Sequence, residues 1–128
     1  MEKQVSEASL WPRDRIGLQL LSDGAGLPIY WNNMPQSGVQ LKLDRSGLVT
    51  VFCGSTEIGQ GSDSILAYIV AEVLGIDCSF LRVVTGDTDL TPVDLGSYSS
   101  RVTLMTGNAA IQAAERARAM LDEAAGRT

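Results

Sequence analysis

Two neighbouring stretches in the first half of the chain have the pattern of β-strands. The apolar residues from Val39 to Leu43 are separated by polar ones, and a mainly apolar stretch follows over residues 48–53. A period of two is typical of a strand that buries one of its faces. The residues between the two stretches, Asp-Arg-Ser-Gly, have the chemistry of a turn. The pattern therefore predicts a β-hairpin over residues 39–53.

Helical spacing replaces this alternation in the next segment. Apolar residues recur at intervals of three and four over residues 62–74, and Gly75 is a natural stop for a helix. These apolar residues are Ile65, Leu66, Ile69, Val70, Val73 and Leu74. Residues 80–85 carry Arg82 as their only charge and predict a further strand.

A last helix is predicted over residues 101–124, with an apolar stripe in which alanine dominates. The stripe consists of Val102, Met105, Ala109, Ala113, Ala117 and Met120. The distance between packed helices depends on the side chains at their contact, so small side chains allow a close approach. We therefore interpret the stripe as a packing surface.

The predicted elements assemble into an α/β (α+β) fold. We expect the hairpin and the strand 80–85 to lie in one sheet, with two helices covering it, in the order β-ββ-α-β-α. The first strand of this order is a candidate edge strand at about residues 15–21, inside a leader that covers residues 1–26. Residues 27–128 form the one domain expected for a chain of 128 residues.

Composition and charge argue against several classes of function. The formal net charge is −5, which argues against nucleic-acid binding and against electrostatic docking on an anionic membrane. The chain has no histidine, which removes the Ser-His-Asp triad and imidazole metal sites. It shows neither a signal peptide nor a long apolar stretch, so we expect a soluble, cytoplasmic protein.

Cysteines and aspartates invite a chemical interpretation. Cys53 and Cys78 have no Cys-x-x-Cys spacing, so we expect both to be buried side chains in a reducing compartment. Asp87, Asp89 and Asp94 fall in one loop, but their spacing does not match a calcium-binding EF-hand loop. Aspartates also bond to the backbone in turns. We therefore expect no metal ligands in this chain.

The glycine-rich segment 54–62 is the first candidate site. It joins the second strand of the hairpin to the next helix, and a helix start offers free backbone N–H groups and a partial positive charge. Gly54, Gly59 and Gly61 permit unusual backbone angles and the close approach of a ligand. The side chain of Gln60, between two glycines, can both donate and accept hydrogen bonds.

A second junction between a loop and a helix lies at residues 97–101, Ser-Tyr-Ser-Ser-Arg. Like the first, it is rich in hydroxyls and poor in charge, which suits a phosphate-bearing or dinucleotide ligand. The alternative is that both junctions are ordinary capped helix starts, with Ser62 as the cap of the first helix and serines as the caps of the second. The residues alone leave both interpretations open.

The hexapeptide at residues 56–61, Thr-Glu-Ile-Gly-Gln-Gly, resembles a signature of a known family. That signature, Thr-Glu-Ile/Met-Gly-Gln-Gly, belongs to the xanthine dehydrogenase/aldehyde oxidase family of molybdenum hydroxylases, and short similar segments follow over residues 71–92. Residues 96–101, Gly-Ser-Tyr-Ser-Ser-Arg, look most like the large subunit of 4-hydroxybenzoyl-CoA reductase. The resemblance covers about residues 27–120 and identifies residues 27–128 as a molybdopterin-binding domain.

The resemblance implies a cofactor, its contacts and its partners. The cofactor is molybdopterin with molybdenum, either plain or as its cytosine dinucleotide. Gln60 would hydrogen-bond the cofactor near its phosphate-bearing side, and the serines and arginine of the second segment would line the pterin. The implied cofactor-binding residues are Gly59, Gln60, Gly61, Ser97, Ser99, Ser100 and Arg101. The implied partners are the remaining domains of the large subunit, an iron–sulfur subunit and an FAD subunit.

The sequence also departs from the family pattern. The family's large subunit is several times longer, and this chain lacks both its other glycine-rich loop and its catalytic glutamate, which Glu57 and Glu72 do not match. We therefore expect no catalytic residue here, but one cofactor-binding part of a hydroxybenzoyl-CoA reductase-like oxidoreductase, inactive by itself. Two alternatives stay open: a non-catalytic module that holds cofactor or subunits, and a small domain that binds another phosphate-bearing ligand.

Overall fold

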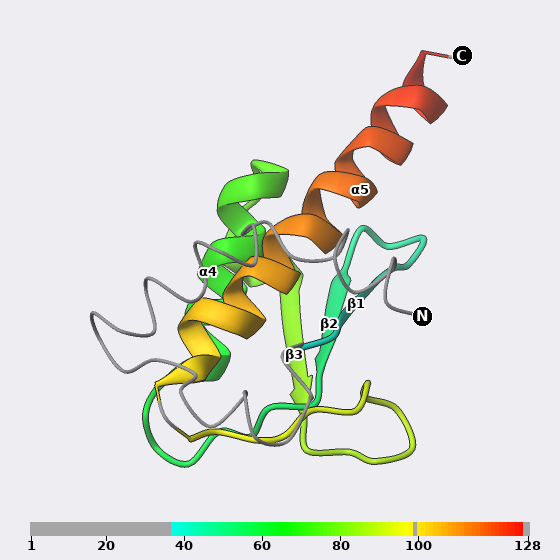
Figure 1. Ribbon diagram of the computed structural model, residues 1–128. Coiled ribbons are helices and arrows are strands. Elements are labelled where there is room, and N and C mark those ends of the chain that lie inside the picture. The colour runs from blue at the N-terminus through cyan, green and yellow to red at the C-terminus, as the bar shows by residue number, and fades with distance from the viewer. Residues whose placement is uncertain (1–36, 99, 127–128) are drawn as a thin grey trace, which may run out of the picture.

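Three strands form the sheet of this domain (Figure 1). The computed structural model describes residues 37–98 and 100–126. The strands lie in the order β1 (Val39–Leu43), β2 (Val49–Cys53) and β3 (Leu81–Thr85). The leader and its candidate strand at residues 15–21 lie outside the described residues.

The predicted hairpin is confirmed. β1 and β2 pair antiparallel, with Val39 opposite Cys53. Asp44 fastens the turn between them, because its Oδ1 accepts hydrogen bonds from the backbone N–H groups of Ser46 and Leu48. An aspartate that satisfies the N–H groups of its own turn explains why the chain reverses here.

Helix α4 (Ser62–Leu74) carries the chain from β2 to β3, and these two strands pair parallel. Its bounds match the predicted helix, and Gly75 ends it in the left-handed conformation with a φ of 71°. A short 3₁₀ helix, Cys78–Phe80, precedes β3, so that strand begins one residue later than predicted. Val51 lies opposite Val83, which confirms that the hairpin and the third strand share one sheet.

The last helix differs from the prediction at its start. Val102–Thr106 forms a π-helical turn, and the α-helix proper, α5, covers Gly107–Ala125. The Gly107 N–H bonds to the carbonyl of Val102, five residues earlier, which is π-helical spacing. Such a turn holds one residue more than an α-helical turn, and it rotates the residues after it by about 100° relative to an uninterrupted α-helix.

This rotation changes which alanines of α5 face the core. Ala110 and Ala114 are buried, whereas Ala109 and Ala113 are only half-buried. Met120, at the end of the predicted stripe, is 70% exposed. The predicted stripe is therefore wrong by one position, because it assumed α-helical spacing through the π-helical turn.

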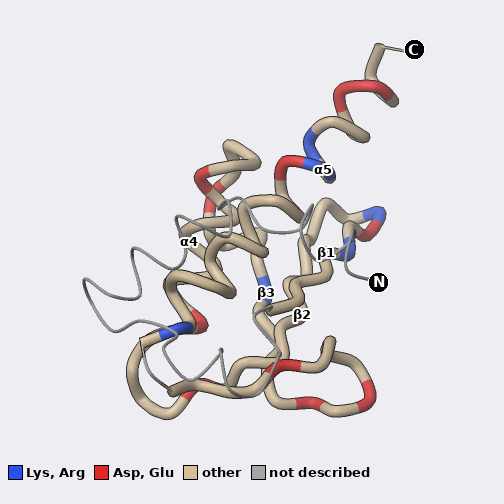
Figure 2. The backbone as a smooth tube through the Cα atoms, viewed as in Figure 1, with Lys and Arg blue, Asp and Glu red and all other residues tan. Residues whose placement is uncertain are grey.

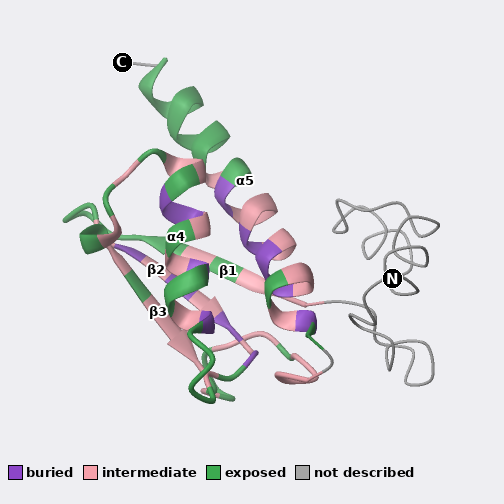
Figure 3. Cartoon of the chain, turned by 90° about the vertical axis from the view of Figure 1, so that its left-hand side faces the viewer, coloured by how far each residue is buried: buried purple, intermediate pink, exposed green. Residues whose placement is uncertain are grey.

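Both helices cover one face of the sheet (Figures 1 and 3). α4 packs against β3, α5 packs against β1, and the two helices pack against each other. The core between them consists of Val49, Val51, Cys53, Leu66, Val70, Ala110 and Ala114. This is the predicted α/β arrangement. Cys53 is buried in it as expected, but Cys78 is only half-buried, because it lies in the turn before β3.

The replacement Ala114→Leu should lower the free energy of unfolding by about 1–3 kcal/mol, because overfilling a packed contact forces its neighbours to shift. Ala114 is 0% exposed where α5 meets the rest of the core. The same replacement at Ala119, an exposed position on the same helix, should change stability by less than about 0.5 kcal/mol. Urea unfolding followed by circular dichroism measures both. Equal effects at the two positions would show that the helices are not closely packed at Ala114.

Candidate functional site

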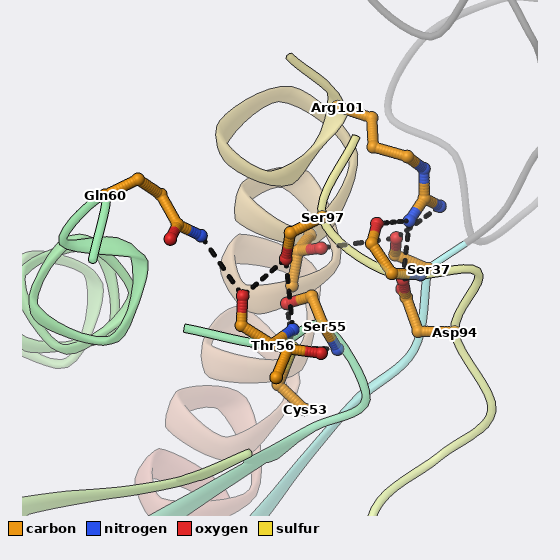
Figure 4. Close-up of polar contacts among 10 residues, drawn as sticks. Ser37, Cys53, Ser55, Thr56, Gln60, Asp94, Ser97 and Arg101 are labelled. Atoms are coloured by element: carbon orange, nitrogen blue, oxygen red, sulfur yellow. Dashed lines mark hydrogen bonds and ion pairs between the residues drawn. The ribbon is translucent and has the colours of Figure 1, made fainter. Parts of the chain in front are cut away.

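The two segments singled out in the sequence meet at one end of the sheet. The first follows β2 and the second follows the loop after β3, and these parallel strands end on the same side. The Ser97 hydroxyl joins the segments through the backbone of Thr56 (Figure 4). Its Oγ accepts a hydrogen bond from the Thr56 N–H at 3.1 Å and donates one to the Thr56 carbonyl oxygen at 2.5 Å. Two segments far apart in the sequence therefore lie side by side and form one candidate site.

Three backbone N–H groups at and just before the start of α4 are already bonded within the chain. The Glu57 carboxylate accepts all of these bonds. Its donors are the N–H groups of Gly59 at 2.7 Å, Gly61 at 3.0 Å and Asp63 at 3.1 Å. The expectation that these groups are free for a ligand is wrong, because this side chain fills the anion-binding position of the helix start.

Glu57 also replaces Ser62 as the cap of α4. The N-cap position is Gly61, with a φ of 80° and no side-chain cap, so the predicted Ser62 cap is wrong. Ser62 lies one position further on, where its hydroxyl bonds to Glu57 and to Gln60. Hydrogen bonds from backbone N–H groups lower the pKa of Glu57 to about 2, and the bond from Asp63 contributes most. The start of α4 therefore carries a fixed negative charge.

The side chain of Gln60 shapes the first segment. Its Oε1 accepts a hydrogen bond from the Ile58 N–H at 2.6 Å. Its Nε2 donates to the Thr56 carbonyl oxygen at 3.1 Å and to the Ser62 hydroxyl at 2.9 Å. What Gln60 can still offer a ligand is the second lone pair of its Oε1.

The glycines of the first segment serve two different purposes. Gly59 and Gly61 have φ values of 95° and 80°, which confirms that unusual backbone angles are needed here. Apart from the neighbouring residues in the chain, no atom of the described residues lies within 4 Å of the place where a Cβ would stand at either position, so the space beside them is open. At Gly54 a Cβ would lie 2.1 Å from the carbonyl oxygen of Pro92. The close approach at Gly54 is therefore made by the chain's own loop and not by a ligand.

Ser100 is exposed in the second segment. Ser100 has a φ of 53°, a left-handed conformation that is uncommon for a residue other than glycine. Ser97 is half-buried and bonded to Thr56, as described above. Ser99 lies outside the described residues. Of the two described serines expected to bind the cofactor, Ser100 is thus the exposed one.

The Arg101 side chain lies inside the protein. It is 0% exposed, and its Nη1 is 2.5 Å from the Asp94 carboxylate (Figure 4). The same nitrogen donates to the Gly96 carbonyl oxygen at 3.0 Å, and Nη2 donates to the Ser37 hydroxyl at 2.9 Å. The guanidinium carbon lies 5.7 Å from the centre of the Tyr98 ring. The structure therefore places this guanidinium on the protein's own groups.

Two of the three aspartates in the loop after β3, which Figure 2 shows in red, bond to the chain through their side chains. Asp87 closes a turn, because its Oδ1 accepts hydrogen bonds from the N–H groups of Asp89 and Leu90. Asp94 pairs with Arg101. The described part of the chain contains no cluster of three His, Cys, Asp or Glu side chains that would suit a metal ion. None of the helices in that part is long and apolar enough to span a membrane.

Sequence analysis missed three residues that build this site. Thr56 takes part through its backbone N–H and carbonyl groups, and a pattern of side chains does not predict contacts of the backbone. Glu57 was compared with a catalytic glutamate, although a carboxylate next to a helix start is a recognisable cap. Asp94 lies seven residues before Arg101, a separation that no local motif specifies.

Glu57→Gln should destabilise the domain at neutral pH and lose this effect in acid. A carboxyl whose pKa is lowered by folding stabilises the folded state above its ordinary value of 4.5, and this contribution disappears as the pH falls towards 2. Urea unfolding of both proteins across that range measures the difference, which should shrink below about pH 4.5. Glu72→Gln, at an exposed carboxylate of α4, is the control. A difference that does not vary with pH would show that the N–H groups do not hold a charge at Glu57.

Known proteins resemble this chain in sequence. The family model described as "Molybdopterin cofactor-binding domain" matches residues 2–128. Subunit gamma of the 6-hydroxypseudooxynicotine dehydrogenase complex of Paenarthrobacter nicotinovorans is 41% identical over 112 residues, which are 84% of this chain and 13% of that protein. A putative xanthine dehydrogenase molybdenum-binding subunit of Escherichia coli is 44% identical over 66 residues, 51% of this chain and 9% of that protein.

The fold is also similar to solved structures. The reconstituted CO dehydrogenase of Oligotropha carboxidovorans superimposes with a TM-score of 0.64 at 32% identity, over 66% of this chain and 11% of that chain. This chain therefore spans about a tenth of the length of the relatives it matches. The particular likeness to 4-hydroxybenzoyl-CoA reductase stays a prediction. The family model, the sequence identity and the shared fold show that the chain belongs to the molybdopterin cofactor-binding domains of the xanthine dehydrogenase and CO dehydrogenase family.

Proposed function

We propose that this chain holds part of the molybdopterin cofactor of a larger molybdenum-dependent oxidoreductase. The observation that carries the proposal is the pair of hydrogen bonds between the Ser97 hydroxyl and the Thr56 backbone. These bonds hold the two predicted binding segments next to each other, so that one ligand can contact both. When bound, the cofactor supplies the redox chemistry. The residues of this chain bind and orient it.

The exposed groups of this surface suit a flat, hydrogen-bonding ring beside the first segment and a phosphate beside the second. Gly59 and Gly61 leave the space beside their backbone open. The Glu57 carboxylate already accepts hydrogen bonds from the N–H groups of Gly59, Gly61 and Asp63 and would repel a phosphate, so we place the phosphate elsewhere. Ser100 offers its hydroxyl at the other segment. This placement reverses the one that the resemblance implies, in which Gln60 lies near the phosphate.

The residues that we assign to cofactor binding are the same seven that the sequence indicates. They are Gly59, Gln60 and Gly61 in the first segment and Ser97, Ser99, Ser100 and Arg101 in the second. The two glycines give access to the backbone, Gln60 offers its remaining lone pair, and Arg101 anchors the second segment. We assign no catalytic role to this chain. The carboxylate of its first segment, Glu57, is bonded as an anion, and its lowered pKa makes it poorly suited to accept a proton.

The assembly and form of the enzyme are part of the same proposal. As partners we propose the remaining domains of a large subunit, an iron–sulfur subunit and an FAD subunit. Relatives support an assembly, because one is a subunit of a dehydrogenase complex and another is a molybdenum-binding subunit. We place the enzyme in the cytoplasm, in line with two free cysteines, and by resemblance we propose the cytosine dinucleotide as the form of the pterin.

For the substrate we propose an aromatic acyl-CoA. The support is the resemblance of residues 96–101 to the large subunit of 4-hydroxybenzoyl-CoA reductase. The relatives are named for other substrates, namely 6-hydroxypseudooxynicotine, xanthine and carbon monoxide. Assays of the assembled enzyme against these compounds distinguish the possibilities.

Gly59→Val and Gly61→Val should lower the pterin and molybdenum content of the assembled enzyme further than their loss of stability explains. A side chain at either position would fill the space through which the cofactor approaches the backbone. Pterin fluorescence after oxidation and elemental analysis measure occupancy, and thermal melts measure stability.

Gly47→Val is the matched control for these two variants. Gly47 has a φ of 88° and open space around it, so valine there meets the same backbone strain, but it lies in the hairpin turn at the other end of β2. The control should be destabilised and still hold its cofactor. Full occupancy in folded Gly59→Val and Gly61→Val, or an equal loss in Gly47→Val, would leave the glycines as turn residues only.

The isolated chain of 128 residues should contain far less than one molybdenum per molecule and show no pterin absorbance. Each hydrogen bond at a site that is open to water contributes only ~0.5–1.5 kcal/mol. The loss of free motion on association costs about 4–15 kcal/mol, which a few such bonds do not offset. Elemental analysis and an absorption spectrum of the purified chain test this. A full equivalent of molybdenum, or turnover without added subunits, would contradict the assignment of this chain as one part of a site.

A further inference from the structure

We propose that Asp94 and Arg101 form a positioning pair, which holds the second segment in its binding geometry without contact between the guanidinium and the cofactor. The inference rests on the proposed function and concerns how the same site is built. It assigns a role to Asp94, which the sequence suggests only as a turn residue or, with a poor match in spacing, as a calcium ligand, and it limits Arg101 to a supporting role.

The pair is buried on both sides. The side chains of Asp94 and Arg101 are each 0% exposed, and Arg101 heads the large, fully buried side chains of the described residues. Asp94 Oδ1 accepts both from Arg101 and from the Gly96 N–H at 2.8 Å. Asp94 Oδ2 is buried and has no hydrogen-bond partner among the described residues. Compensation of the Asp94 charge therefore depends on Arg101, and loss of one partner leaves a buried charge unpaired.

The guanidinium connects distant parts of the chain. Besides Asp94, it bonds to the Gly96 carbonyl oxygen and to Ser37, which precedes β1. The Ser37 hydroxyl in turn accepts a hydrogen bond from Thr106 of the π-helical turn at 3.2 Å. A planar group with five donors can satisfy several acceptors at once, which an ammonium on a flexible stem does less well. Arg101 thus ties the loop after β3 and the π-helical turn to the start of β1.

The Asp94 end of the pair is fixed against the first segment. A Cβ at Gly54 would lie 2.8 Å from the Asp94 Cβ, so only glycine allows this loop to lie so close to the end of β2. Since the first segment begins at Gly54, the pair and the bond between Ser97 and Thr56 hold the two segments together at two separate points.

The residue that the pair holds in place is Ser100. It directly precedes Arg101, is exposed, and stands at a φ of 53°. A serine stays in this conformation only where its surroundings enforce it. If the guanidinium turned outwards to a ligand, the Asp94 carboxylate would stay buried without its ion pair. The backbone at Ser100 would then no longer be held in its left-handed conformation. The geometry therefore points to Ser100 as the group that meets the ligand and to Arg101 as its support.

A double-mutant cycle tests the proposal, with the variants Asp94→Asn, Arg101→Gln and the two combined. In the assembled enzyme, each single variant should lower pterin affinity about 10- to 100-fold, the range typical when a group that supports a ligand-binding residue is removed. The combined variant should lose no more than the weaker-binding single variant, because the two side chains act as one unit.

Hydrogen exchange of the isolated chain provides a second measurement that needs no cofactor. Peptides that cover residues 94–101 should exchange faster in each single variant, while peptides from β2 and α4 keep the wild-type rate. If a single variant does not fold, the combined variant still decides, because it leaves no unpaired buried charge and should fold with a loosened segment.

Several results would overturn the proposal. One is a loss of pterin in Arg101→Gln with none in Asp94→Asn, because the guanidinium would then act on the cofactor itself. Additive losses in the combined variant, or unchanged exchange over residues 94–101, would do the same. Arg82→Gln and Asp89→Asn, both at exposed positions, are the matched controls and should behave as wild type. A wild-type enzyme without pterin would instead contradict the proposed function, and hydrogen exchange would still decide whether the pair holds the segment.

Discussion

The main chain of Thr56 is the point on which the site depends. Its N–H and its carbonyl oxygen both bond to the Ser97 hydroxyl, and the carbonyl also accepts a hydrogen bond from Gln60. Backbone groups that leave a sheet need other partners, and for Thr56, three residues after β2, a side chain from a distant loop bonds to both groups. The bonds that satisfy this backbone therefore also couple the two segments. This is possible because α4 returns the chain so that β3 runs parallel to β2 and ends beside it.

Features that depend on neighbouring residues could be predicted from the sequence. The period of two predicts the hairpin, and Asp44 closes it through bonds within its own turn. The helical spacing predicts α4, and Gly75 predicts where it ends. Glycine has no Cβ and adopts a positive φ readily, so the sequence indicates such angles at Gly59 and Gly61, where the structure has them. In each case the energy that decides the structure comes from residues within a few positions of one another.

The features that escaped prediction depend on contacts between distant residues or on an exception to regular spacing. The π-helical turn is such an exception, and it moved the buried stripe of α5 to Ala110 and Ala114. The family resemblance implies that Arg101 lines the pterin. The hydrogen bond from the Arg101 guanidinium to Ser37 joins two positions that no sequence pattern connects. The helix start was expected to offer free N–H groups, since nothing in the spacing alone shows that Glu57 folds back onto them.

The charge of Glu57 has a consequence for the orientation of any ligand on this surface. With its pKa near 2, this carboxylate stays ionised at every physiological pH, and it uses the N–H groups that would otherwise attract an anion. A phosphate beside Glu57 would meet a like charge, and the N–H groups of Gly59, Gly61 and Asp63 are already bonded, whereas an uncharged ring would meet the open side of Gly59 and Gly61. For the proposed cofactor, which has a ring and an anionic tail, this favours one direction over the other. The orientation that we propose has the ring beside the glycines and the phosphate away from Glu57, towards Ser100.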